Sequence, residues 1–301
     1  MKSVSVGMVL IWYTSELTKQ RVMRMRTGMQ QTLRDTLGVT GQYVEYCREE
    51  RNFVAVLYAQ LLHQRRLASF LDALELDPTL AEGAKVYVEY AALRDMWYET
   101  KAQCRSLDEL NARYRRAILL MLGPLGESLS LPEATQAFNE FFLGCGPRPV
   151  SKEQIQMPSR WNDRLFVQWR DMAGGSLALA ERICLIKFAF NAKPDLVIEL
   201  SDGSVVCIEA KLGSGVGRYT VKSEEAGHCM RSSQIHVQEF LFNELLQLKS
   251  HFVVLSGSKN VGLTDGWKGI NWQRAFDAVC RADDDRSMVA AFRQSRFINR
   301  G

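Results

Sequence analysis

Two carboxylates and one amine lie close together in the sequence, with a spacing that suits phosphoryl chemistry. Asp195 is followed fourteen residues later by Glu209, and Lys211 stands two residues beyond. Two adjacent carboxylates form a hard oxygen site suited to Mg²⁺ or Mn²⁺, and the main-chain carbonyl of Ala210 can add a third oxygen. A lysine beside the ion can orient a water molecule and offset charge that develops on phosphorus. These residue types predict metal-dependent hydrolysis of a phosphodiester.

A β-hairpin is the element that must position these groups. Residues 196–200 and 205–210 are short β-rich runs, and Ser-Asp-Gly-Ser at 201–204 separates them with a strong hairpin signal. On a strand, Glu209 and Lys211 point to the same face, and a twisted hairpin brings Asp195 beside Glu209. The competing interpretation is a surface hairpin with an ordinary ion pair, which contributes little to stability. We favour the catalytic interpretation because a Glu after Val-Val-Cys-Ile is unusual in a structural strand.

The pattern Pro194-Asp195 followed by Glu209-Ala210-Lys211 resembles the PD-(D/E)XK nuclease superfamily, also called restriction-endonuclease-like. The resemblance covers residues 180–257, about a quarter of the chain. It implies an α/β (α+β) core in the order helix, three-stranded meander, helix, strand, with a mixed central sheet flanked by helices. It also implies that Asp195 and Glu209 bind the metal and that Lys211 positions the nucleophilic water.

The helix expected after the hairpin, from Ser232 or Ser233 to Leu248, adds a glutamine candidate. Gln234 and Gln238 are four residues apart and share a helical face. Branches of the family similar to RecB and phage exonucleases have a glutamine on this helix near the site, and we assign that position to Gln234. The match is partial, because those branches have Tyr four residues later, where this chain has Gln238. A strand is expected at 251–255.

A further acidic residue is expected from the first core helix, and two positions compete for it. Glu50 falls amid Phe53, Val54, Leu57 and Leu61 on a helical wheel, and a carboxylate on an apolar face requires a partner or a metal. Glu181 is nearer to Asp195, but Cys184, Ile186, Phe188 and Phe190 alternate as the first strand of the meander would. We favour Glu50, with the intervening helices as an insertion.

The prolines suggest a division of the chain near residue 150. Five of the seven prolines lie between residues 124 and 158, between two proline-poor segments. We expect a mostly helical region over 1–150, which contributes the first core helix near 48–63, and a nuclease domain over 151–301. Helical periodicity marks residues 22–37, 53–62, 86–97 and 107–122.

The composition is that of an ordinary globular protein and excludes several classes. The 301 residues are 47% hydrophobic and 24% charged, and the formal net charge is +4. The seven scattered cysteines include no CxxC pair, which argues against a disulfide framework or zinc ribbon and favours reduced thiols in the cytoplasm. No run is long and apolar enough for a membrane span, so no membrane partner is expected.

The expected function is therefore a Mg²⁺- or Mn²⁺-dependent nuclease acting on DNA, with RNA as the other possible substrate. By analogy with its superfamily, such an enzyme can serve DNA processing or antiviral defence. The helical half can mediate contact with a second copy or a protein partner. The alternative is a non-catalytic nucleic-acid-binding or scaffold protein with a nuclease-like fold, but the intact Asp195, Glu209 and Lys211 argue against it.

Overall fold

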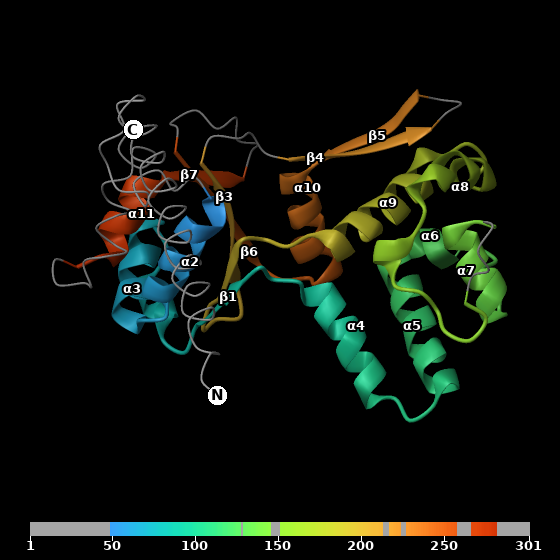
Figure 1. Cartoon of the computed structure of the whole chain (residues 1–301), viewed down its shortest axis with the longest axis horizontal. Coiled ribbons are helices and arrows are strands. Elements are labelled where there is room, and N and C mark those ends of the chain that lie inside the picture. Colours follow the sequence, from blue (N-terminus) through green and yellow to red (C-terminus); the bar gives the residue numbers. More distant parts are fainter. Residues whose placement is uncertain are drawn as a thin grey trace, which may run out of the picture. The chain divides into compact units, whose positions relative to one another are not determined.

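A five-stranded mixed sheet is the centre of the fold (Figure 1). The computed structural model describes residues 49–127, 129–145, 151–212, 217–223, 227–257 and 266–281. The strands follow the spatial order β1-β2-β3-β6-β7. Their bounds are β1 Lys85–Val88, β2 Leu196–Glu199, β3 Val205–Lys211, β6 Ser250–Ser256 and β7 Trp267–Asn271. The mixed α/β class expected from the sequence is confirmed.

The predicted hairpin is present and forms the middle of the sheet. β2 pairs antiparallel with β3, with Leu196 opposite Ile208, and β1 extends the meander on the far side of β2. In the connecting turn, Asp202 accepts hydrogen bonds from the main-chain N–H of Ser204 at 2.9 Å and from its hydroxyl. Gly203 has φ of 80°, a conformation that glycine adopts without steric cost. Beyond β3, the strands β6 and β7 are parallel to it.

Helices cover both faces of the sheet, which is why β3 is buried along its whole length. Val206, Ile208 and Ala210 of β3 face one apolar cluster, and Val205 and Cys207 face the other. The helices that contribute to the first cluster are α2 Glu50–Leu61, α3 Gln64–Ala73 and α11 Trp272–Val279. Those that contribute to the second include α4 Ala92–Gln103, α5 Leu107–Leu122, α7 Thr135–Leu143, α8 Phe166–Met172, α9 Leu177–Asn191 and α10 Gln234–Glu239.

The expected first strand at Cys184–Phe190 is wrong, because these residues belong to α9. Eight of the fifteen residues of α9 are buried, and they lie around the helix rather than along one stripe. A helix that is apolar on most sides shows no clear period of 3.6, so its sequence also fits the alternation of a strand.

The strand that completes the meander is β1, at Lys85–Val88. The predicted helix over 86–97 is therefore wrong at its start, since α4 begins only at Ala92. Pairing of β1 with β2 decides the conformation of this short segment. The predicted helix over 107–122 is confirmed as α5, whose first turn is capped by the hydroxyl of Ser106. The helix expected over 22–37 lies outside the described residues.

After the hairpin, a helix and then a strand follow in the predicted order, but a β-ribbon precedes the helix and a π-helical segment follows it. A two-stranded antiparallel ribbon, β4 Arg218–Ser223 and β5 Gly227–Ser233, precedes α10. The expected cap at Ser233 is confirmed, since its hydroxyl accepts the N–H of His236 at 3.0 Å. After six residues α10 widens into a π-helical segment, Phe240–Leu245. The strand expected at 251–255 is confirmed as β6.

The boundary expected near residue 150 does not separate two units of the described chain. All described residues belong to one compact unit. Helix α2 and strand β1, from before that position, pack against and pair with the strands that follow it. The segment from α4 to α9 is therefore inserted between the first and second strands of one sheet. No helix among the described residues is both long and apolar enough to cross a membrane.

Candidate active site

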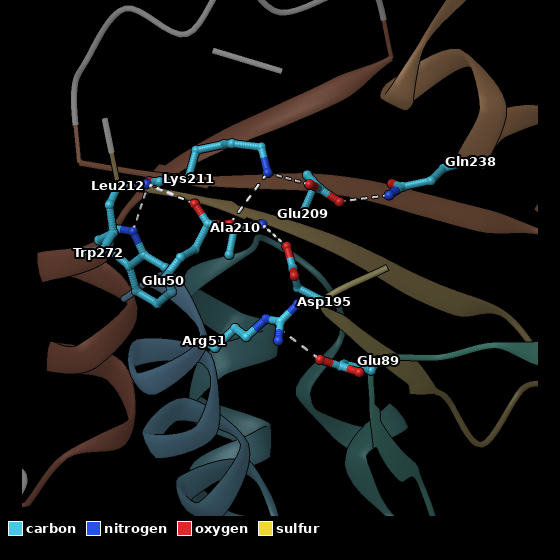
Figure 2. Close-up of polar contacts among 10 residues, drawn as sticks. All are labelled: Glu50, Arg51, Glu89, Asp195, Glu209, Ala210, Lys211, Leu212, Gln238 and Trp272. Carbon is cyan, nitrogen blue, oxygen red and sulfur yellow. Dashed lines mark hydrogen bonds and ion pairs between the residues drawn. The ribbon is translucent and has the colours of Figure 1, made fainter. Parts of the chain in front are cut away.

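Asp195, Glu209 and Lys211 converge at the end of β3 where the sheet meets α2 and α10 (Figure 2). The register that pairs Leu196 with Ile208 brings Asp195, one residue earlier, level with Glu209. The main-chain N–H of Ala210 donates to Oδ2 of Asp195 at 2.8 Å, which fixes that carboxylate against β3. The hairpin thus brings together the three side chains that the sequence predicted, with the Ala210 main chain between them.

Glu209 is buried and is held by two donors from different directions. Its side chain is 1% exposed, a position that an ionised carboxylate occupies only when it is paired. The ammonium of Lys211 forms an ion pair with Oε1 of Glu209. The amide of Gln238 in α10 donates to Oε2 at 2.7 Å. Both oxygens of Glu209 therefore have fixed partners.

Glu50, the first residue of α2, also reaches this site. Its Oε2 accepts the main-chain N–H of Leu212 at 3.2 Å, and its Oε1 lies 3.5 Å from Nζ of Lys211. Its rival, Glu181, lies in α9 next to Arg182, which pairs instead with Glu244. Among the described residues, no hydrogen bond or ion pair joins Glu181 to the site. Of the two candidates, Glu50 is the one that forms an ion pair with Lys211 in the described structure.

The glutamine that contacts the carboxylates is Gln238 and not the predicted Gln234. Gln238 is fully buried, donates to Glu209, and accepts from the thiol of Cys207 at 3.4 Å. Gln234 is the first residue of α10, and its main-chain N–H donates to the carbonyl of Gly217 at 2.8 Å. The four-residue spacing correctly placed both on one side of the helix, but Gln234 lies one turn too early to reach Glu209.

Trp272 and Tyr219 adjoin the site and were not identified from the sequence. The indole Nε1 of Trp272 donates to the carbonyl of Lys211 at 3.0 Å, and the main-chain N–H of Gly257 donates to the same oxygen at 3.1 Å. These bonds fix the backbone that carries the lysine. Tyr219 of β4 stacks on Phe188 with ring centroids 4.7 Å apart, and burial followed by the nearby charge of Glu209 raises the pKa of its phenol. Neither aromatic residue has a local sequence signal, because each reaches the site from a distant element.

The carboxylates strongly affect one another's protonation. Burial, followed by the charge of Glu209, raises the pKa of Asp195 to about 7. Burial also raises the pKa of Glu209, although Lys211 and Gln238 oppose that change. Burial lowers the pKa of Lys211, but the charges of Glu209, Glu50 and Asp195 outweigh it, so the pKa is raised and the lysine stays cationic. One ammonium therefore faces three carboxyl groups.

This excess of carboxylates over cations bears on whether the site suits a bound metal ion. Burial and the charge of Glu209 disfavour the ionised form of Asp195 more than Lys211 favours it, and a divalent ion beside the carboxylate would favour that form. Within the described ranges, no three His, Cys, Asp or Glu side chains are grouped so that they could hold one ion together. An ion would therefore take Asp195 and Glu209 as side-chain ligands, and main-chain or solvent oxygens would complete the set. Mg²⁺ normally binds in this way, since it keeps several waters.

Comparison with known proteins gives no relative from which a function can be transferred. No family model, curated protein or solved structure matches this chain. The geometry and electrostatics of the site are therefore the basis for its function.

Proposed function

We propose that this protein is a metal-dependent nuclease of the PD-(D/E)XK type that hydrolyses phosphodiester bonds of DNA. The observation that carries the proposal is the convergence of Asp195, Glu209, Lys211 and Glu50 from three separate elements. A surface ion pair would leave Glu209 in water. Here it is 1% exposed beside a second carboxylate, an arrangement that costs folding free energy and is typical of functional sites.

The order of elements supports a restriction-endonuclease-like core. Helix α2, the antiparallel meander β1-β2-β3, helix α10 and the parallel strand β6 follow one another as the resemblance implies. Asp195 precedes the second strand of the meander, and Glu209 and Lys211 lie on the third. The long helical insertion between β1 and β2 explains why the first helix and strand lie so far from the motif in the sequence.

Each residue of the site has a distinct task in the proposed reaction. Asp195 and Glu209, with the carbonyl of Ala210, would hold Mg²⁺ or Mn²⁺, which polarises the phosphodiester and lowers the pKa of a bound water. Lys211 supplies a fixed positive charge that orients the nucleophile and stabilises negative charge developing on the phosphate. Glu50 forms a second ion pair with the lysine, its Oε1 lying 3.5 Å from Nζ of Lys211. Gln238 positions Glu209 without adding charge.

Two exposed cations beside the site are suited to contact the nucleic-acid backbone. Arg51, at the start of α2, lies 3.8 Å from Glu89, and Lys193 lies 3.7 Å from the same carboxylate. Glu89 donates its main-chain N–H to the carbonyl of Asp195 at 3.2 Å, so this group adjoins the proposed metal ligands (Figure 2). Cations at such positions bind phosphates with an affinity that falls as salt rises.

Cleavage of supercoiled and linear DNA by the full chain tests the proposal. We expect cleavage with Mg²⁺ or Mn²⁺, none with EDTA, and a loss of at least about a hundredfold in Asp195→Asn and in Lys211→Met. Asp202→Asn is the matched control, because Asp202 lies in the turn of the same hairpin and outside the site. It should retain full cleavage.

Undiminished cleavage by Asp195→Asn would contradict the proposed site. Binding of DNA without cleavage, across both metals and both topologies, would favour the non-catalytic alternative. A matched RNA substrate in the same assay separates the two nucleic acids.

A further inference from the structure

A cavity of about 330 Å³ lies in the helical insertion, lined by residues other than those of the proposed metal site. Helix α4 forms one wall with residues 94, 97, 98 and 101, whose spacing places them on one helical face. Residues 154–160 form much of the opposite wall. The volume lies within the range typical of sites for small ligands.

The cavity is positively charged. Three of its lining residues are cations, Arg94, Lys101 and Arg160, and none is Asp or Glu. Within the described part of the chain, the polar partners of Lys101 and Arg160 are neutral amide oxygens, at Gln154 (3.4 Å) and Gln156 (2.8 Å). Amide oxygens orient a cation without cancelling its charge, so the cavity attracts an anion.

Arg94 has fewer polar side-chain partners than the other two cations that line the cavity. Its Nε is buried and has no hydrogen-bond partner in the described structure. A buried donor without an acceptor lowers stability, and native proteins retain few of them. Because Arg94 lines the cavity and forms no ion pair with an acidic residue in the described part of the chain, an anion bound there would meet a cation whose charge is not cancelled.

Aromatic side chains give the cavity a second property. Trp97 stacks on Tyr114 with ring centroids 3.6 Å apart, and both are buried parts of the wall. Tyr98 also lines the cavity but is 62% exposed, so its ring is open to a flat partner. Tyrosine rings stack on nucleobases without strong preference for the base.

The wall opposite α4 is preorganised. The buried amide of Asn139 donates to the carbonyls of Ser151 and Gln154, at 2.8 and 3.0 Å, and accepts the N–H of Gln156 at 2.9 Å. Asn111 accepts the N–H of Ile155 at 2.9 Å. The segment is therefore held in place without a ligand, which lowers the entropic cost of binding.

We propose that this cavity binds a nucleotide, with the phosphate on Arg94, Lys101 and Arg160 and the base on Tyr98. The ligand is either a free nucleotide or one nucleotide of a nucleic-acid strand, and both present a phosphate beside a flat base. This binding does not depend on the metal site, so it can be tested whether or not the chain is a nuclease.

Calorimetry with the full chain in EDTA provides the test, since the proposed cleavage needs a metal. The probes are adenosine 5′-monophosphate, adenosine, inorganic phosphate, and a ten-nucleotide single strand of thymidylate. We expect the nucleotide or the strand to bind at least about tenfold more tightly than adenosine or phosphate. Arg94→Gln and Tyr98→Ala should each weaken that binding about tenfold.

Arg116→Gln is the matched control, because Arg116 is an exposed arginine of α5 that does not line the cavity. It removes the same charge and should change affinity less than about twofold. Binding of the free nucleotide indicates a soluble ligand, and binding of the strand alone indicates a nucleic-acid contact. Failure of both to bind, inorganic phosphate binding as tightly as either, or equal weakening by Arg116→Gln would overturn the proposal. Melting curves identify any variant that does not fold.

Discussion

Asp195 is the residue at which the reasoning about the site can be tested most directly. Its pKa of about 7 in the folded chain compares with an ordinary value of 3.8. Between these values the folded state binds a proton that the unfolded state has released, so stability must fall as pH rises from about 4 to about 7. At about 1.4 kcal/mol per pH unit, the full effect is about 4 kcal/mol.

The substitution Asp195→Asn removes this ionisation while keeping an oxygen for the N–H of Ala210. The new amide NH₂ needs its own partner, which costs about 1–2 kcal/mol if none is found. Without metal at about pH 8, we therefore expect the variant to be more stable than the wild type by about 2–3 kcal/mol. The stability advantage of the variant should shrink as the pH falls from about 8 to about 5, because protonation of Asp195 stabilises the folded wild type.

Denaturant unfolding in EDTA at several pH values measures this difference. Adding Mn²⁺ should stabilise the wild type and leave the variant nearly unchanged, since binding to the folded state alone raises its stability. For the control Asp202→Asn, the stability difference from the wild type should change with pH in the opposite direction. Hydrogen bonds from Ser204 lower the pKa of Asp202. The ionised Asp202 therefore stabilises the folded state at neutral pH, and this stabilisation is lost on acidification. A stability difference between Asp195→Asn and the wild type that does not vary with pH would contradict a raised pKa of Asp195 in the folded state.

Three further substitutions test the surroundings of the site and the insertion. Gln238→Ala should weaken Mn²⁺ binding about tenfold or more in calorimetry, because it leaves Glu209, a proposed metal ligand, without its orienting donor, whereas Gln234→Ala should not. Trp272→Phe should lower the unfolding free energy by about 1 kcal/mol and reduce cleavage, since the carbonyl of Lys211 loses one of its two donors. Tyr114→Phe should cost about 1–2 kcal/mol in thermal melts without affecting Mn²⁺ affinity, because its hydroxyl bonds a buried carbonyl in the insertion.

Local signals were reliable wherever local geometry decides the conformation. The Asp-Gly turn between two β-rich runs correctly predicted the hairpin, and the cap at Ser233 correctly predicted where α10 begins. Glu50 was found because a carboxylate amid apolar residues needs a partner that the protein must provide. These inferences succeeded because turns, caps and helical faces depend on residues within one or two turns of each other.

Signals failed wherever packing decides between two conformations. Lys85–Val88 is a strand because β2 lies beside it, and its four residues carry too short a pattern to show this. Cys184–Phe190 belongs to helix α9, which is buried on most sides. Apolar residues on most sides of a helix leave no clear period of 3.6 in its sequence, so the pattern did not distinguish a helix from a strand. The proline-rich stretch looked like a boundary, but it belongs to an insertion whose two ends return to the same sheet.

The sequence was enough to predict that Asp195 and Glu209 lie together, that Lys211 shares the strand face of Glu209, and that a hairpin holds them. Residue type and a period of two are enough for that inference. How Glu50, Gln238 and Trp272 contact the site follows from the packing of elements that are distant in the sequence. Those partners lie 29 to 162 residues from the groups they contact. Contacts over such separations depend on how the elements pack, and no local pattern encodes them.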